Sequence, residues 1–123
     1  MKLSNGTMNL YLKSLSAVSN KVKGKLGYCV ARNMRKLSSE LVEFENTKNK
    51  YIFEHGVEDE NGTFSIDTRT SQYKDFLAYM KDFIEIEHEV DIIKVSEEEI
   101  YDSELTADEI LSLDFMIFSE KDE

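Results

Sequence analysis

The sequence predicts an α+β fold that is mainly helical, with a long central helix, a small β element and a C-terminal helix. Apolar residues recur every three or four positions through residues 8–18 and 26–51, which is the period of a buried helix face. Residues 85–92 then alternate acidic and apolar, which is the period of a strand. The 123 residues contain no proline, as is common in helical chains. Their number fits a single domain, residues 1–123.

The first two predicted helices are separated by a short turn. Ser4 or Asn5 can cap the first helix, and the polar residues 19–25 around Gly24 predict the turn. The second helix has the longest apolar seam in the chain, with spacings close to a heptad. Its members are Leu26, Val30, Met34, Leu37, Leu41, Phe44, Lys48 and Tyr51. Gly56 is a natural stop, so the helix would span about 30 residues and about 45 Å.

Such a helix is longer than a protein of this size is wide. Two outcomes stay open at this point. Part of the helix can project from the body or pack against a second copy, which would make a homo-oligomer through the long helix. Alternatively, the helix kinks near Gly27 or Asn33, and both halves lie within one domain.

The second half of the chain is predicted to be more varied. Asn61-Gly62 indicates a turn or hairpin with a β segment at 63–66, followed by a helix that begins at Thr70 or Ser71. The alternating residues 86–93 predict a half-buried strand with an acidic outer face. Two capping boxes are indicated: Ser96 with Glu99, and Thr106 with Glu109. The second of these would open a last helix that spans Ala107 to about Phe118.

Charge is segregated along the chain. The net charge is −10 and the pI about 4.7, which excludes a generally basic protein that coats nucleic acid. Residues 1–36 nevertheless carry +8, residues 37–56 carry −2 and residues 57–123 carry −16. Either the two parts attract each other, within one fold or across an oligomer, or an acidic face meets a basic partner.

Targeting signals are not expected. No apolar run approaches the roughly 18 residues of a membrane span, and the first residues lack the apolar stretch of a signal peptide. A single cysteine, Cys29, cannot form an internal disulfide. We therefore expect an intracellular protein with no membrane association.

Candidate catalytic and metal-binding patterns are weak. His88 lies among acidic residues, but strand geometry turns those acids to the opposite face, so we expect no metal site. Cys29 lies beside the apolar seam and is expected to be a small core residue. The five glycines are scattered and form no phosphate loop. The sequence therefore predicts neither a cofactor nor an enzyme.

Two charged surfaces are the candidate binding sites. The acidic one would bind a host protein with a basic surface; its residues are Glu85, Glu87, Glu89, Asp91, Glu97, Glu98 and Glu99. The basic one could hold the phosphates of a small ligand; its residues are Lys21, Lys23, Lys25, Arg32 and Arg35. Direct binding to nucleic acid is not expected, because the net charge repels it.

Several short motifs occur in a characteristic order along nearly the whole chain. They are Lys2-Leu3-Ser4-Asn5-Gly6, a basic entry to the long helix, His55-Gly56 followed by Asp59-Glu60-Asn61-Gly62, and the tail from Thr106 to Ile117. This order resembles a family of short uncharacterised proteins encoded by tailed phages and prophages of Gram-positive bacteria. The resemblance implies a phage accessory protein, not an enzyme, that acts in the cytoplasm of a bacterial host.

Three functions follow from these expectations. The first is inhibition of a host nucleic-acid-handling or defence protein by binding to its basic surface. The second is a role in phage morphogenesis, in which the long helix and the last helix build an oligomer. The third is sequestration of a small phosphorylated ligand by the basic residues.

Overall fold

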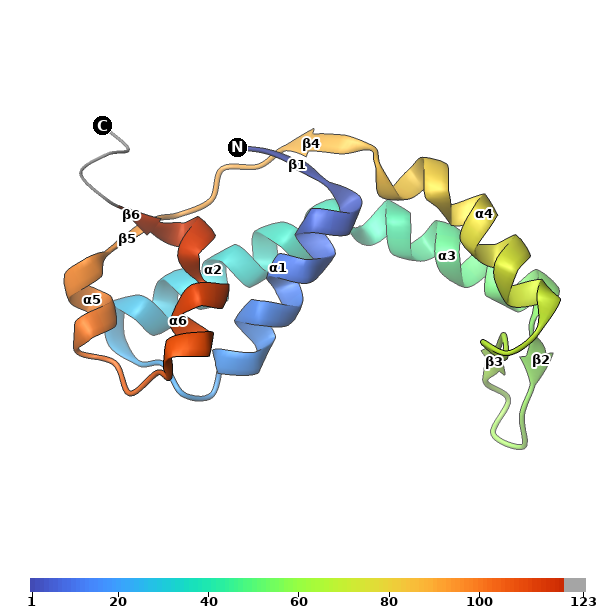
Figure 1. Ribbon diagram of the computed structural model, residues 1–123, viewed down its shortest axis with the longest axis horizontal. Helices are drawn as coiled ribbons and strands as arrows, with labels where there is room; N and C mark the ends of the chain where they lie inside the picture. Colours follow the sequence, from blue (N-terminus) through green and yellow to red (C-terminus); the bar gives the residue numbers. More distant parts are fainter. Residues whose placement is uncertain (119–123) are drawn as a thin grey trace.

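The computed structural model describes residues 1–118 and shows an elongated, mainly helical α+β protein (Figure 1). In this part of the chain 62% of the structure is helical. The helices are α1 (Asn5–Val18), α2 (Gly24–Glu40), α3 (Val42–His55), α4 (Ser71–Ile84), α5 (Glu97–Tyr101) and α6 (Ala107–Ser112), with a 3-10 turn η1 (Asp114–Met116). The predicted fold class is confirmed.

The strands are short and form three separate pairs. They are β1 (Lys2–Ser4), β2 (Val57–Glu58), β3 (Phe64–Ser65), β4 (Glu87–Glu89), β5 (Val95–Ser96) and β6 (Ile117–Phe118). β1 and β4 pair antiparallel with Leu3 opposite His88, β2 and β3 form the predicted hairpin, and β5 and β6 pair in parallel. β1 was not predicted, because three residues are too few to show an alternating pattern.

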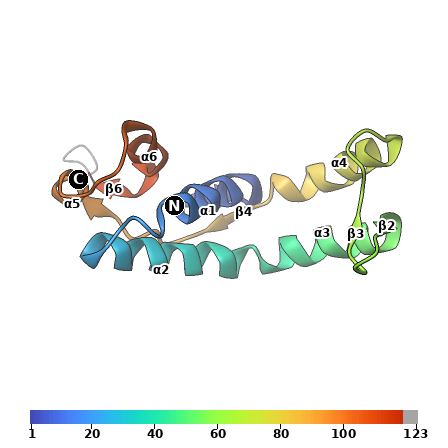
Figure 2. The ribbon, with the colours of Figure 1, turned by 90° about the horizontal axis from the view of Figure 1, so that it is seen from below.

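The predicted long helix is present as two helices, α2 and α3, that run end to end (Figure 2). They meet at Leu41, whose backbone stays in the right-handed helical region at φ −87° but whose ψ of −3° departs from the usual helix value. The amide of Leu41 still donates to the carbonyl of Leu37, and the amide of Glu45 donates to that of Leu41. The alternative of a kink near Gly27 or Asn33 is therefore wrong in position, since both lie inside α2.

The apolar seam of this rod faces the rest of the chain. Leu26, Val30 and Leu37 of α2 are buried, as are Leu41 and Phe44, whereas Lys48 and Tyr51 further along are only half-buried. α1 packs on α2, and α4 packs on α3 (Figure 2). The heptad-like spacing is thus satisfied within one chain.

Asn33 is a fully buried polar residue in the middle of α2. Its side-chain amide donates to the carbonyl of Ile93 at 2.9 Å, and its side-chain oxygen accepts from the amide of Ile93 at 2.9 Å. This pair of hydrogen bonds replaces the partners that a neighbouring strand would give to Ile93. Asn33 therefore fastens the extended segment between β4 and β5 to α2.

The C-terminal part differs from the prediction. The capping box of Thr106 and Glu109 is confirmed, but Ser96 makes no side-chain hydrogen bond to the start of α5. The predicted helix from Ala107 to about Phe118 is wrong in length, because α6 ends at Ser112 and the chain continues into η1 and β6. This change of direction buries Leu113 and Met116 and stacks the ring of Phe115 on Tyr11 at 3.9 Å, whereas Leu111 stays exposed.

α3, the β2–β3 hairpin and α4 (residues 42–84), here called the arm, extend away from the other elements (Figure 1). Within residues 1–118, only Phe44 and Met80 of the arm belong to the buried hydrophobic core. The rest of the arm is held by half-exposed aromatic contacts, such as Tyr51 against Tyr79 at 4.6 Å and Phe53 against Phe64 at 4.7 Å.

We expect the arm to open more readily than the body. Local opening is easiest where few apolar groups are buried. In native-state hydrogen exchange, amides of residues 48–80 should therefore exchange faster than those in the middle of α1 and α2, by about tenfold for each 1.4 kcal/mol of stability difference. Equal protection of both regions would contradict this prediction.

Candidate protein-binding site at the helix junction

The start of α1 meets the end of α4. Ser4 caps α1 by accepting from the amide of Thr7, which leaves Asn5 free to turn toward α4. The Asn5 side chain donates to the carbonyl of Phe83 at 2.8 Å, and its backbone amide donates to the carbonyl of Ile86 at 2.9 Å. Donors at the start of α1 thus bind carbonyls at and just beyond the end of α4. The positive end of the α1 dipole therefore lies next to the negative end of the α4 dipole.

A small cavity lies at this junction. Its volume is about 120 Å³. α1, α2, α3, α4 and the start of β4 all contribute to its lining, which consists of Asn5, Glu40, Glu43, Phe44, Thr47, Phe83, Ile86 and His88. We call it the junction cavity. It combines apolar walls with two carboxylates, and neither Lys nor Arg lines it.

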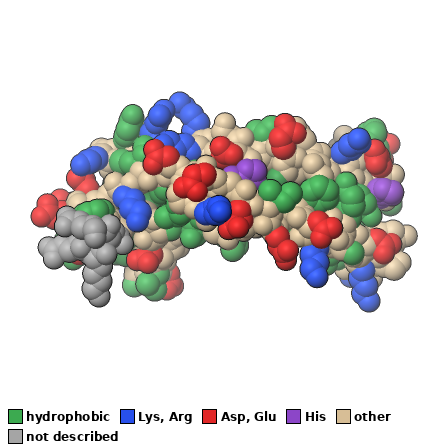
Figure 3. Space-filling view, turned by 90° about the horizontal axis from the view of Figure 1, so that it is seen from above, with side chains coloured by type: hydrophobic (Ala, Val, Ile, Leu, Met, Phe, Trp, Pro, Cys, Tyr) green, Lys and Arg blue, Asp and Glu red, His purple; other side chains and the backbone are tan. Residues whose placement is uncertain are grey.

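The predicted acidic row runs from this junction along the extended chain: Glu85 and Glu87 flank Ile86 of the junction cavity, whereas Glu89 and Asp91 line another cavity beside α2. Glu85, Glu87, Glu89 and Asp91 are all exposed, while Val90 and Ile92 between and beyond them are buried. Seen from the side of β1 and β4, Figure 3 shows Asp and Glu side chains distributed along the molecule, with hydrophobic side chains exposed over the arm. The strand itself covers only Glu87–Glu89, so the alternation is partly carried by extended chain.

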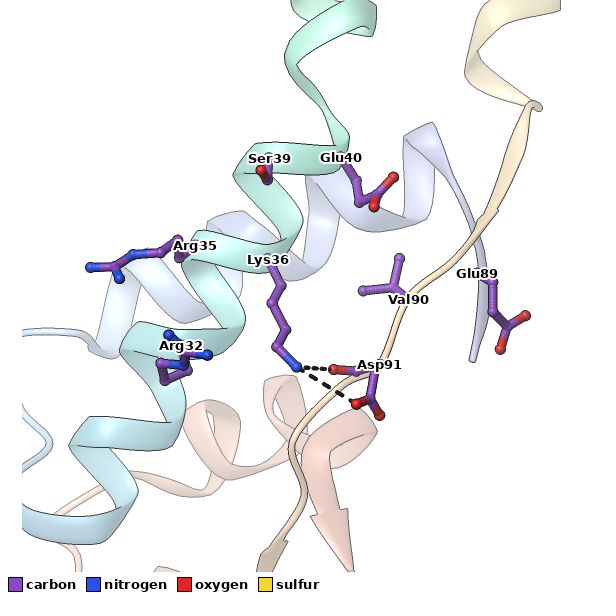
Figure 4. Close-up of a pocket in the computed structure, with 8 residues that line it drawn as sticks. All are labelled: Arg32, Arg35, Lys36, Ser39, Glu40, Glu89, Val90 and Asp91. Carbon is purple, nitrogen blue, oxygen red and sulfur yellow. Dashed lines mark hydrogen bonds and ion pairs between the residues drawn. The ribbon is translucent and has the colours of Figure 1, made fainter.

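Two members of the row, Glu89 and Asp91, contact positive groups of the same chain. The Met1 ammonium group lies 2.8 Å from Glu89, and its hydrogen bond and charge lower the pKa of that carboxyl. Lys36 donates to the carbonyl oxygen of Asp91 at 2.7 Å and lies 3.8 Å from its carboxylate (Figure 4). The interpretation that the basic and acidic parts attract each other therefore holds at these two positions.

Glu85 and Glu87 make no ion pair within residues 1–118. They lie beside the exposed side chains of Ile84 and Ile86, which are 38% and 47% accessible. Glu40 and Glu43 lie in the lining of the adjacent cavity, and the carboxylate of Glu40 lies 3.6 Å from the Nδ1 atom of His88. Within residues 1–118 the junction thus places three carboxylates without an ion pair, those of Glu43, Glu85 and Glu87, near exposed apolar groups.

The other three predicted acids lie elsewhere. Glu97, Glu98 and Glu99 form the first turn of α5, at one end of the molecule, whereas β4 lies near its middle (Figure 1). Glu97 accepts a hydrogen bond from Tyr101, which raises the pKa of that phenol. Acidic residues at the start of a helix complement its dipole, which gives these three a structural role. The seven predicted acids therefore make two surfaces, not one.

The predicted anion-binding residues are also divided. Lys21, Lys23 and Lys25 line a cavity of about 310 Å³ before and at the start of α2, but Glu99, Asp102 and Glu104 line the same cavity. Lys21 in addition pairs with Glu109 at 2.7 Å, which lowers the pKa of that carboxyl.

Arg32 and Arg35 lie further along α2, beside a second cavity of about 290 Å³ (Figure 4). Lys36 and Asp91 also line it. The five basic residues thus belong to two separate surfaces, and anion binding there stays a prediction.

The remaining candidate residues, Cys29 and His88, occupy structural positions in the fold. Cys29 is buried in the core as predicted, and His88 is half-buried opposite Leu3. In residues 1–118 no group of three or more His, Cys, Asp or Glu side chains is placed to hold a metal ion. No helix in this range has the length and apolar character to cross a bilayer.

Sequence reasoning missed the inner half of the site. Glu40 and Glu43 flank Leu41 on the long helix, and nothing in their local pattern shows that they meet Asn5 and Phe83. Asn5 was recognised only as a candidate cap. The one available signal was that Ser4 and Asn5 are both residue types that cap helices. A helix start needs only one cap, so the second residue was free for another contact.

Comparison with known proteins identifies no relative. No protein family, no curated protein and no solved structure matches the chain.

Proposed function

We propose that this protein acts by binding a partner protein through the acidic surface at the junction of α1, α4 and β4. The surface consists of Glu85 and Glu87 with the exposed Ile84 and Ile86, next to the junction cavity. We further propose, from the sequence resemblance, that it is a phage or prophage accessory protein. It would act in the cytoplasm of a bacterial host and block a basic surface of a nucleic-acid-handling or defence protein.

The observation that supports this proposal is the set of carboxylates without cationic partners. Glu89, Asp91 and Glu109, in contrast, each lie within 4 Å of a positive group of the same chain. Glu85 and Glu87 stay exposed beside apolar side chains, a combination that suits an interface with an apolar centre and a charged rim. Acidic charge also accelerates association with a basic surface.

The test is affinity capture from a lysate of a Gram-positive bacterium with three baits. They are the wild type, the double variant Glu85→Lys/Glu87→Lys, and the control Glu58→Lys/Glu60→Lys on the β2–β3 hairpin, which makes the same change in net charge. We expect the wild type and the control to retain the same protein, and the Glu85→Lys/Glu87→Lys bait to lose it at least tenfold, about 1.4 kcal/mol.

Circular dichroism should show the same helix content in all three baits, because the substituted residues are exposed. Equal capture by all three would contradict the proposal, since binding would then not depend on the acids at the junction.

A second candidate function is assembly of several copies, as in phage morphogenesis. Exposed apolar side chains on the arm favour it, among them Phe53 (64% accessible), Leu77 and Tyr79. Light scattering of the purified protein separates the two functions. A stable multimer without a captured partner would favour assembly, and a monomer that retains a partner would favour binding.

A further inference from the structure

Asn5, which lines the junction cavity, carries a buried acceptor without a hydrogen-bond partner in the described part of the chain. Asn5 is 4% exposed, and its side-chain nitrogen is already engaged by the carbonyl of Phe83. Its side-chain oxygen is the one buried side-chain oxygen or nitrogen in residues 1–118 that has no hydrogen-bond partner. A buried acceptor without a donor costs free energy, so the site favours an occupant that can donate.

The other polar groups around the cavity favour the same kind of occupant. Glu40 and Glu43 offer carboxylate oxygens from the α2 and α3 sides, and Thr47 offers a hydroxyl one turn beyond Glu43. Neither Lys nor Arg lines the cavity, and the one lining residue that can carry a positive charge is His88, 3.6 Å from Glu40. An anion would face two carboxylates here, and a purely apolar group would leave the oxygen of Asn5 unpaired.

The apolar walls and the volume of the junction cavity further limit which chemical group can occupy it. Phe44, Phe83 and Ile86 suit an aliphatic chain, and an aromatic face also attracts a guanidinium group. About 120 Å³ is well below the roughly 300–1,000 Å³ of pockets for small-molecule ligands. The occupant is therefore the size of a side chain, with an apolar stem and several donors at its tip.

We propose that the junction cavity receives an arginine side chain of the bound protein. This inference rests on the proposed function, because the arginine comes from the basic partner. Its planar head has five N–H donors for the acceptors of Asn5, Glu40 and Glu43, and its stem packs against the phenylalanines. The carboxylates of Glu85 and Glu87 outside the cavity then guide the basic surface into place.

The test uses NMR of the ¹⁵N-labelled protein and does not need the partner. The probe is arginine blocked at both ends, Nα-acetyl-arginine-N-methylamide. Its control is the blocked citrulline, which has the same shape and a neutral head. We expect saturable shifts at the Asn5 side-chain amide and at the backbone amides of the cavity lining with the arginine probe, and at least several-fold weaker binding of the citrulline.

Two variants localise the effect. Glu43→Gln removes one charge from the cavity, and Glu54→Gln makes the same change at the far end of α3, where the side chain is exposed. The arginine probe should bind Glu43→Gln several-fold more weakly and Glu54→Gln as it binds the wild type.

Four results would overturn the inference. Three of them are no saturable shifts at the cavity, equal binding of arginine and citrulline probes, and shifts confined to other acids such as those of α5. Free L-arginine that binds far more tightly than the blocked probe would assign the cavity to a free metabolite and would also overturn it. Equal capture by all three baits in the lysate experiment would instead contradict the proposed function, and the titration would still test the cavity because it is independent of any partner.

Discussion

Replacement of Asn33 by alanine should destabilise the protein by about 2–4 kcal/mol, because two hydrogen bonds are lost and a buried amide and carbonyl are left without partners. Asn33 is fully buried, and both bonds go to the backbone of Ile93, 60 residues away in the sequence. The extended segment between β4 and β5 would lose its fastening to α2. Urea denaturation followed by circular dichroism measures the change in unfolding free energy.

Two further variants separate the hydrogen bonds from the volume of the side chain. Asn33→Leu fills the space but makes no hydrogen bond, so it should be destabilised as strongly as Asn33→Ala. Asn49→Ala makes the same chemical change at an exposed position of α3 and should lie within about 0.5 kcal/mol of the wild type. Wild-type stability in Asn33→Leu would show that packing alone determines the role of Asn33.

Replacement of Leu37 by alanine is the second large expected effect, a loss of about 2–5 kcal/mol from the transfer free energy of the removed atoms and the cavity that they leave. Leu37 is fully buried on the inner face of α2, and its carbonyl also accepts from the amide of Leu41 at the bend of the rod. Thermal and urea unfolding should both move to milder conditions.

The matched control for Leu37→Ala is Val42→Ala, an apolar truncation on the same rod at a residue that is 49% exposed. It should change the unfolding free energy by less than about 0.5 kcal/mol. Similar losses in the two variants would mean that the apolar seam does not face the core.

Sequence patterns formed by residues close together in the chain predicted the fold well. The seam from Leu26 to Phe44 identified the inner face of the rod, and the Thr106–Glu109 capping box identified the start of α6. Both depend on interactions between residues that lie close together in the sequence. The bend at Leu41 carried no such signal, because the helix hydrogen bonds continue on both sides of it without a glycine or proline.

Features that depend on contacts distant in the sequence could not be predicted. β1 exists because Leu3 pairs with His88, and Asn33 is buried because Ile93 lies beside it. The acidic row was found because it is a sequence pattern. Its pairing with Lys36 and with the Met1 ammonium group, and its proximity to Glu40 and Glu43, depend on the tertiary structure.

This distinction also explains which acids matter for the proposed binding. Sequence pattern treats Glu85, Glu87, Glu89 and Asp91 as equivalent. The structure separates the first two, which make no ion pair within residues 1–118, from the last two, which already contact positive groups of the same chain. Reversing the charge of Glu89 or Asp91 would therefore disturb the fold's own contacts, so the pair Glu85 and Glu87 makes the cleaner test.

The central claim is that binding depends on unpaired carboxylates at the junction, and a salt series tests it most directly. Capture by the wild-type protein is measured from the same lysate at increasing ionic strength. We expect the retained protein to be released progressively as salt rises, because exposed charges are screened beyond about 10 Å at 0.1 M salt. Capture that is the same at low and high salt would contradict the claim and would point to the apolar arm as the binding surface.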